Sequence, residues 1–359
     1  MIVKDEAAVI GRTLQSLPPI FSSYAIVDTG STDATIAIIK RELEYLTGVV
    51  VESEWKGFAE SRNEALKVAT DFGGYAVFLD ADSTLTLDDG FDEASIKNQL
   101  DSQVHSVLIE GQGITYPRQA ITRFDAPVRY RGVLHEFLEC DESALVGGLL
   151  QGLRINNNAS GVSSRNNDPY KYINDVALLH GALQTPGDED LQARYHFYLG
   201  QSYQDAGLLE HALIEYQRCA ETSSWRDEQY VARLSSARLM KLTGHDDDEV
   251  LDELRRACEH NPLRAESYHE ISRIERNRRN WAGAYSAAMT GLQFTPPPNS
   301  LFMETESHQY GLLFEFSLAS WYVGRKSEAR DAWEKLVADP GLPLHLRELC
   351  EANAGFYVN

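Results

Sequence analysis

The sequence is poor in cysteine and has no long hydrophobic run. Its 359 residues include four cysteines, which are widely spaced and form no Cys-x-x-Cys pair: Cys140, Cys219, Cys258 and Cys350. This pattern argues against a disulfide framework or a zinc site and is typical of ordinary thiols in a reducing compartment. No stretch approaches 18 consecutive apolar residues, so no membrane span is predicted. The segment Met1–Glu6 turns acidic at once, so we expect no secretory signal and predict a cytoplasmic protein.

Positive charge is scarce as well. The chain has 33 Lys+Arg against 54 Asp+Glu, which gives a formal net charge of −21 at pH 7. Proteins whose main partner is a phosphate backbone usually present a basic face. We therefore expect no nucleic-acid partner.

The chain is long enough for two domains with sizeable cores. Short apolar strands alternate with helical stretches in the first half, whereas helix pairs replace them from Leu191 onward. Strand–helix alternation predicts a Rossmann-like, mostly parallel sheet that binds ligands beyond the carboxyl ends of its strands. We predict an α/β domain over residues 1–155, a linker with a bridging helix over 156–190, and an all-α repeat domain over 191–359.

The spacing of apolar residues locates the elements of the first domain. The predicted strands are Met1–Val3, Tyr24–Val27, Val49–Val51, Tyr75–Leu79 and Val104–Glu110. The predicted helices are Glu6–Leu17, Thr35–Leu46, Ser61–Ala69 and the bridging helix Pro169–Leu183.

The most informative feature is the carboxylate pair Asp80-Ala81-Asp82, which follows a buried strand directly. Two carboxylates at this spacing form a hard-oxygen clip for Mg²⁺ or Mn²⁺, and such an ion would hold a phosphate-bearing substrate. A strand-end turn, in which the Asp side chains accept bonds from local backbone N–H groups, explains the same triplet without a ligand.

A second acidic loop, Asp28-Thr-Gly-Ser-Thr-Asp33, lies at another strand end. Gly30 permits a turn that a β-carbon would strain, and Ser31, Thr32 or Asp33 can cap the following helix. Capping explains some of these residues. A carboxylate at Asp28 can in addition accept the imide N–H of uracil, which a helix cap does not require.

Four segments in order resemble family 2 glycosyltransferases of the GT-A fold: Met1–Glu6, Val27–Asp33, Arg62–Leu66 and Phe78–Asp82. The spacing between the segments is similar too. The resemblance implies a nucleotide-sugar donor whose base, ribose and diphosphate are held by Val3, Asp5, Asp28, Arg62, Asn63, Asp80 and Ala81. It also implies a Mn²⁺ or Mg²⁺ ion at Asp82 and Asp80.

The segment Tyr130–Leu138 extends the resemblance to a subgroup that includes some lipopolysaccharide-core and peptide glycosyltransferases. An inverting transfer needs a base within hydrogen-bond reach of the acceptor hydroxyl, and Glu136 is our candidate. His135 is a candidate third metal ligand or diphosphate contact. If the segment is a strand, its neighbours face opposite ways, so one of the two is a core residue.

The chain departs from the subgroup in three places. Ser83 occupies a position that commonly carries Glu, and little of the usual first strand precedes Val3. Where such enzymes often have a metal-binding His, Ile155–Asn158 has only asparagines. We therefore expect Asp82 and the diphosphate itself to hold the metal.

Small and large residues alternate at about 34 residues in the second half, as in tetratricopeptide repeats. The predicted units are Ala193–Ser224, Val231–Pro262, Ala265–Pro296 and Tyr310–Pro340. Their concave face would bind a peptide or protein, although a rigid stalk or a homodimerisation arm fits the same pattern. Pro296–Asn299 is read as a stiff break between repeats.

The sequence therefore favours a metal-dependent inverting glycosyltransferase of the hexosyltransferase type. We expect a UDP-sugar donor and a peptide, protein or glycan acceptor. One alternative is a haloacid-dehalogenase-type phosphatase, in which Asp80 would attack phosphorus and Asp82 would act as the acid. Another is a repeat scaffold that carries an inactive transferase domain.

Overall fold

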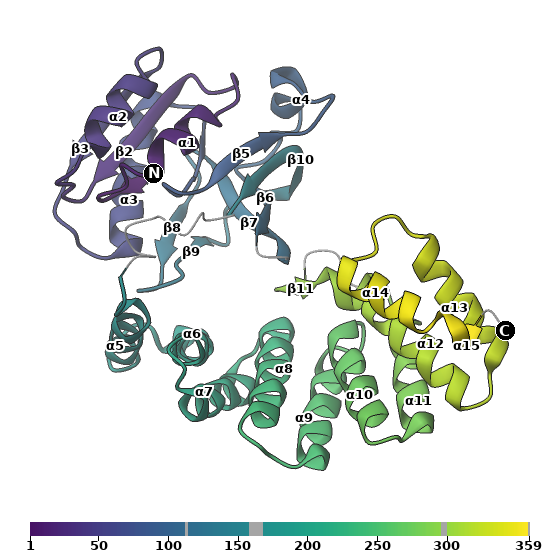
Figure 1. The fold of residues 1–359 in the computed structure, drawn as a ribbon. Helices are drawn as coiled ribbons and strands as arrows, with labels where there is room; N and C mark the ends of the chain where they lie inside the picture. The colour runs from purple at the N-terminus through teal and green to yellow at the C-terminus, as the bar shows by residue number, and fades with distance from the viewer. Residues whose placement is uncertain (112–113, 158–167, 296–299, 358–359) are drawn as a thin grey trace. The chain divides into compact units, whose positions relative to one another are not determined.

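The computed structural model describes residues 1–111, 114–157, 168–295 and 300–357. They form two compact units, Met1–Gly187 and Asp188–Asn359 (Figure 1). The division falls inside the segment 156–190 that was predicted as a linker. Helix α5 (Lys171–Leu183) belongs to the first unit.

The first unit begins with a parallel sheet of β1 (Ile2–Val3), β2 (Ser23–Asp28) and β3 (Thr47–Glu52), in the order β1-β2-β3. Helices α1 (Ile10–Gln15) and α2 (Thr35–Glu42) follow β1 and β2. They bury a shared apolar core of Val3, Ile10, Leu14, Ile26, Ile39, Leu43 and Ala81. Alternation of strand and helix thus brings the ends of β1 and β2 to one edge.

Helix α1 is shorter than the predicted helix Glu6–Leu17. The amide of Asp5 donates to Ser31 Oγ (2.9 Å), that of Glu6 to Thr35 Oγ1 (2.8 Å) and that of Ala7 to Asp33 Oδ2 (3.0 Å). Because side chains of the second loop and the start of α2 satisfy these amides, the segment bends and turns against that loop and the helix starts later.

A second sheet of the first unit has the order β7-β6-β10-β5, with β4 on β7. Its strands are β4 (Tyr75–Val77), β5 (Thr84–Leu87), β6 (Val104–Gly111), β7 (Ile114–Arg123) and β10 (Val146–Asn156). Among the described residues of these strands, β6 and β10 pair in parallel and the other pairs are antiparallel. The predicted α/β class is confirmed, and the parallel pairing expected from strand–helix alternation holds for β1–β3. Strands β6 and β7 are separated by only two residues, too few for the crossover that a parallel pair needs, and they pair antiparallel.

The first unit also contains several further elements. They are α3 (Phe58–Ala69), a 3₁₀ turn (Thr70–Phe72), α4 (Glu93–Lys97) and the two-stranded ribbon β8 (Val128–Arg131) and β9 (Phe137–Cys140). Phe78 and Tyr130 pack edge to face, with ring centroids 5.0 Å apart. This contact fixes the end of β4 against the ribbon.

The second unit consists of helical hairpins, as predicted. The pairs are α6 (Gln192–Asp205) with α7 (Leu209–Thr222), α8 (Arg226–Leu242) with α9 (Asp247–His260), α10 (Ala265–Asn277) with α11 (Trp281–Gly291), and α12 (Leu312–Tyr322) with α13 (Lys326–Ala338). Helices α14 (Leu344–Ala352) and α15 (Ala354–Tyr357) close the unit, and the short strand β11 (Met303–Glu304) precedes a π-helical turn (Ser307–Gly311). The predicted break Pro296–Asn299 lies outside the described residues.

Small residues let the paired helices approach closely. A β-carbon at Gly200 would lie 2.8 Å from the ring of Tyr216, a distance that real contacts do not show. The Leu199-Gly200 and Tyr216 positions of the repeat pattern are therefore the two sides of one contact. Among the described residues, no helix is long and apolar enough to cross a membrane.

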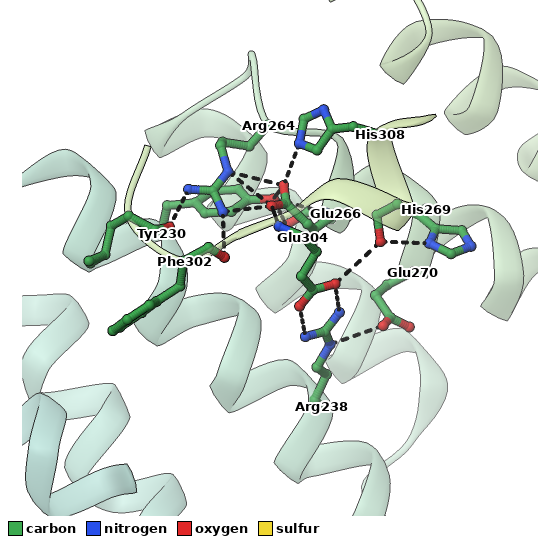
Figure 2. A network of polar contacts seen from close by, with 12 residues as sticks. Tyr230, Arg238, Arg264, Glu266, His269, Glu270, Phe302, Glu304 and His308 are labelled. Carbon is green, nitrogen blue, oxygen red and sulfur yellow. Dashed lines mark hydrogen bonds and ion pairs between the residues drawn. The ribbon is translucent and has the colours of Figure 1, made fainter. Parts of the chain in front are cut away.

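A buried ion pair lies at the start of α10. Arg264 and Glu266 both have fully buried side chains and are joined at 2.6 Å. The hydroxyl of Tyr230 donates to Glu266 Oε2 at 3.2 Å. His308 Nε2 lies 3.2 Å from the same oxygen (Figure 2). Burial alone would raise the pKa of Glu266, but hydrogen bonds from His308 and Arg264 outweigh it and hold that pKa well below its usual range.

Replacing Glu266 with Gln should destabilise the chain by about 3–5 kcal/mol at pH 7, because Arg264 would be left buried without its counter-charge. A lowered folded-state pKa stabilises the protein above the unfolded pKa of roughly 4.3 and ceases to do so as the pH falls through the folded value. Urea denaturation should therefore show the difference between the two proteins shrinking below about pH 4.

The exposed pair Arg255–Asp252 provides the control. Asp252→Asn should change the stability by no more than about 0.5 kcal/mol. An equally small effect of Glu266→Gln would contradict the role assigned to the buried pair.

Candidate active site

The carboxyl ends of β1 and β2 meet at the acidic loop. The carbonyl of Val3 accepts from the amide (2.9 Å) and the hydroxyl (3.1 Å) of Thr29. Asp5 Oδ1 accepts from the amide of Thr32 at 2.6 Å, and Asp5 itself has a φ of 53°. These hydrogen bonds therefore join the segment Val3–Asp5 to the loop that follows Asp28.

Asp28 is buried, with 1% of its surface exposed. Its Oδ1 accepts from the amides of Gly30 (2.9 Å) and Ser31 (2.8 Å), in a turn for which Gly30 takes a φ of 104°. Its Oδ2 is buried and has no hydrogen-bond partner among the described residues. A buried carboxylate oxygen without a partner is costly, so this atom is a candidate contact for a ligand that donates a proton.

Asp80, beyond the end of β4, lies between two arginines. Arg62 Nη2 donates to Asp80 Oδ1 at 2.5 Å, and Arg118 Nη1 lies 3.5 Å from Asp80 Oδ2. Burial raises the pKa of Asp80, but Arg62 and Arg118 outweigh it and hold that pKa well below its usual range. The sequence analysis missed Arg118, because it lies on β7 and reaches the site only through sheet pairing.

Arg62 is the centre of the site. Its Nε donates to Glu136 while its Nη2 holds Asp80, so one guanidinium binds two carboxylates. The ring of Tyr130 packs 5.5 Å from its central carbon. Asn63 Oδ1 accepts from the amide of Tyr130 (2.7 Å) and its Nδ2 donates to the carbonyl (3.0 Å), which fixes α3 to the ribbon.

Glu136 and His135 lie in the loop that joins β8 to β9, residues 132–136, and not on a strand. The expectation that strand alternation separates them is therefore wrong, since Gly132 and His135 both have positive φ (99° and 49°) and turn the chain. The Glu136 side chain is 9% exposed and faces Arg62. His135 is exposed.

Two side chains of helix α1 bind the main chain of the loop that carries the carboxylate pair. Thr13 Oγ1 donates to the carbonyl of Ala81 (2.7 Å), and Arg12 Nη2 donates to that of Asp82 (2.8 Å). The Ser83 hydroxyl donates to Asn157 at 2.7 Å, so the asparagine run reaches this loop. Asn158 lies outside the described residues.

The residues present fit a metal ion that arrives with its substrate. No group of three or more His, Cys, Asp or Glu in the described ranges is placed to hold an ion by itself. Arginines already neutralise Asp80, so Asp82 is the carboxylate of the pair that would bind an ion. Mg²⁺ sites are often built from one or two carboxylates together with substrate phosphates, so Asp82 and a diphosphate form a suitable set.

The Arg62–Glu136 contact should be strongly coupled. A double-mutant cycle of Arg62→Gln and Glu136→Gln, measured by chemical denaturation, should give an interaction energy of roughly 1.5–3 kcal/mol, because both side chains are largely buried. The pair Lys56–Glu64, whose lysine is 57% exposed, is the matched control and should couple by no more than about 1 kcal/mol. Equal coupling in the two cycles would show that the site pair has no special role in the fold.

Comparison with known proteins gives a family match for the first part of the chain. Residues 1–89 match the family described as Glycosyl transferase family 2. That match includes Asp28, Arg62 and Asp80–Asp82 and ends before Arg118 and Glu136. It supports a glycosyltransferase.

A curated TPR repeat-containing protein of Synechococcus elongatus is 31% identical over 145 residues, which are 39% of this chain and 34% of that protein. The chain thus spans about a third of the length of this relative. A tetratricopeptide repeat protein of Parabacteroides merdae is similar over 52% of this chain and 68% of its own, at 14% identity and a TM-score of 0.40. A TPR protein of Thermus thermophilus covers 51% of this chain and 91% of its own, at 15% identity and a TM-score of 0.35. The chain combines a region similar to Glycosyl transferase family 2 with a unit built of helical hairpins.

Proposed function

We propose that this protein is an inverting, metal-dependent glycosyltransferase of the hexosyltransferase type that uses a UDP-sugar. The observation that carries the proposal is the buried Oδ2 of Asp28, at the carboxyl end of β2, which has no hydrogen-bond partner among the described residues. A doubly wound sheet binds nucleotides at this edge.

The proposed base contact follows from the two oxygens of Asp28. Oδ1 is committed to the turn at Gly30 and Ser31. Oδ2 is left as an acceptor, and the N3–H of uracil is a donor. Cytosine has an acceptor at the same ring position, so it would face the carboxylate with two lone pairs opposed. The site thus favours uridine nucleotides.

The diphosphate would lie near Asp82, with Arg118 as a nearby cation. A divalent ion held by Asp82 and the phosphates would neutralise the charge that develops on the leaving diphosphate. Arg62 keeps Asp80 ionised and fixed in place, which suits that carboxylate to accept hydrogen bonds from ribose hydroxyls.

Glu136 is the proposed base. The acceptor oxygen attacks the anomeric carbon, the bond from that carbon to the diphosphate breaks, and the acceptor proton passes to Glu136. Arg62 holds one oxygen of Glu136, so the carboxylate has a fixed orientation and its second oxygen is available to the acceptor. The acceptor is proposed to be a peptide, protein or glycan, and a protein partner is consistent with the tetratricopeptide-like repeats.

The two rival functions have less support. A phosphatase would need Asp80 as a nucleophile, yet Arg62 and Arg118 bind both of its oxygens. The family match also covers the 79 residues before it. An inactive scaffold is disfavoured because Asp80, Asp82 and Arg62 are all present and arranged together.

Asp28→Asn should change which base is bound. The amide oxygen must take the place of Oδ1 to serve Gly30 and Ser31, so the NH₂ group replaces Oδ2. An acceptor becomes a donor, which repels uracil N3–H and suits cytosine N3. Isothermal titration should show UDP binding weakened by roughly tenfold to a hundredfold and the UDP/CDP preference reduced or reversed.

Asp33→Asn, which alters the same loop at its far end, is the control and should leave the ratio of UDP to CDP affinity unchanged. A wild-type ratio in Asp28→Asn would mean that Asp28 does not contact the base.

Glu136→Gln should retain nucleotide binding but lower sugar transfer by a factor of roughly 10²–10⁴, the usual loss for a general base. Transfer and UDP affinity are measured on the same sample in Mn²⁺, together with the anomeric configuration of the product. Inversion is expected. A retained anomer, or full transfer by the variant to a hydroxyl acceptor, would assign the base to another residue.

A further inference from the structure

A five-residue segment, Ser300–Glu304, crosses the first helices of three successive hairpins, turning at Leu301 and Phe302 before it continues as β11. We call it the strap. Phe302 stacks on Phe197 of α6, with ring centroids 6.0 Å apart and planes at 18°. The amide of Leu301 donates to Asp227 of α8 at 2.9 Å. The amide of Glu304 donates to Glu266 of α10 at 3.1 Å.

Helix side chains also bind the carbonyl groups of the strap. Arg264 Nη1 donates to the carbonyl of Leu301 (2.9 Å) and its Nη2 to that of Phe302 (3.4 Å). Figure 2 shows Arg264 and Glu266 beside this backbone. Both side chains are fully buried. The helices therefore present donors and acceptors to a main chain, which is how proteins bind extended peptides.

Two side chains of the strap have dedicated partners. Arg238 Nη1 and Nη2 donate to the two oxygens of Glu304 at 2.5 and 2.9 Å, a bidentate contact (Figure 2). Hydrogen bonds and charge from Arg238 lower the pKa of Glu304, against the effect of burial. The helices thus contact an aromatic side chain of the strap, Phe302, and a carboxylate two positions later, Glu304.

The strap is held against its own backbone preference. Phe302 has a φ of 46°, a value that is strained for a bulky residue. The first helices of stacked hairpins share one face, and in such repeats that face is the one that binds partners. The strap therefore has the position and the contacts of a peptide ligand.

We propose that the strap is a built-in ligand that closes a peptide-binding groove on α6, α8 and α10. The groove accepts a peptide with the pattern aromatic-x-Glu from another molecule when that peptide displaces the strap. If the strap simply left, Arg264, Glu266 and Asp227 would lose partners in a buried site. Exchange for another main chain is therefore favoured over an empty groove.

The wild-type chain should bind such a peptide weakly. A tethered segment competes at an effective concentration in the millimolar range, so a micromolar peptide does not displace it. Weakening the strap without touching the groove should expose the site. Phe302→Ala with Glu304→Gln does this, because it removes the ring and the carboxylate and leaves Phe197 and Arg238 in place.

The experiment uses a fluorescent peptide with the sequence Ser-Leu-Phe-Met-Glu-Thr-Glu, residues 300–306, and the full chain. Fluorescence anisotropy should show the double variant binding the peptide at least about tenfold more tightly than wild type does, since one or two charge-assisted bonds no longer compete. Adding Arg238→Gln should remove the gain. A peptide with Ala in place of its Phe should bind none of the proteins.

Circular dichroism establishes that each variant is folded. If the double variant unfolds, Glu304→Gln alone carries the test, and a gain of about threefold is expected. Folded variants that bind the peptide no better than wild type, or that bind a scrambled peptide equally well, would show that the strap is only a structural element and would overturn the proposal.

Discussion

The first unit depends on one guanidinium group placed between two carboxylates. Arg62 comes from α3, Asp80 from the end of β4 and Glu136 from the loop between β8 and β9. Asp80 and Glu136 lie 18 and 74 residues from Arg62 in the sequence, and the ion pairs hold the three residues together. Because all three side chains are largely shielded from water, removing any one leaves an uncompensated charge. The same contacts that stabilise the fold thus set the geometry of the proposed chemistry.

The repeats also contain arginines that bind carboxylates, but there the arginines hold the strap. Arg264 and Arg238 each bind carboxylates on one side and hold the strap on the other. Buried arginines of this kind suit fixed, multidentate contacts because the planar fork presents several donors at once. The chain is strongly acidic overall, yet several of its cations are directed inward, toward sites rather than toward the surface.

The features that depend on neighbouring residues in the sequence could be predicted from it. The strands and helices of residues 1–79 apart from the late start of α1, the turn at Gly30, and the paired small and large residues of the repeats follow from periodicity and steric limits. Long-range pairing decided the rest. Arg118 reaches Asp80 only because β7 pairs with β4, and the position of Glu136 in a loop depends on positive φ at Gly132 and His135. The strap has no short motif, since its partners are spread from Phe197 to Glu266 along the sequence.

The anchoring of Ala81 and Asp82 by α1 has a consequence for how this protein can diverge. Thr13 and Arg12 bind carbonyl groups, not side chains, of the loop that carries the carboxylate pair. Side chains in that loop can therefore be exchanged by mutation without disturbing the anchor, whereas an insertion or deletion would break it. Related chains with a different donor preference should accordingly maintain the length of this loop and the hydroxyl at position 13.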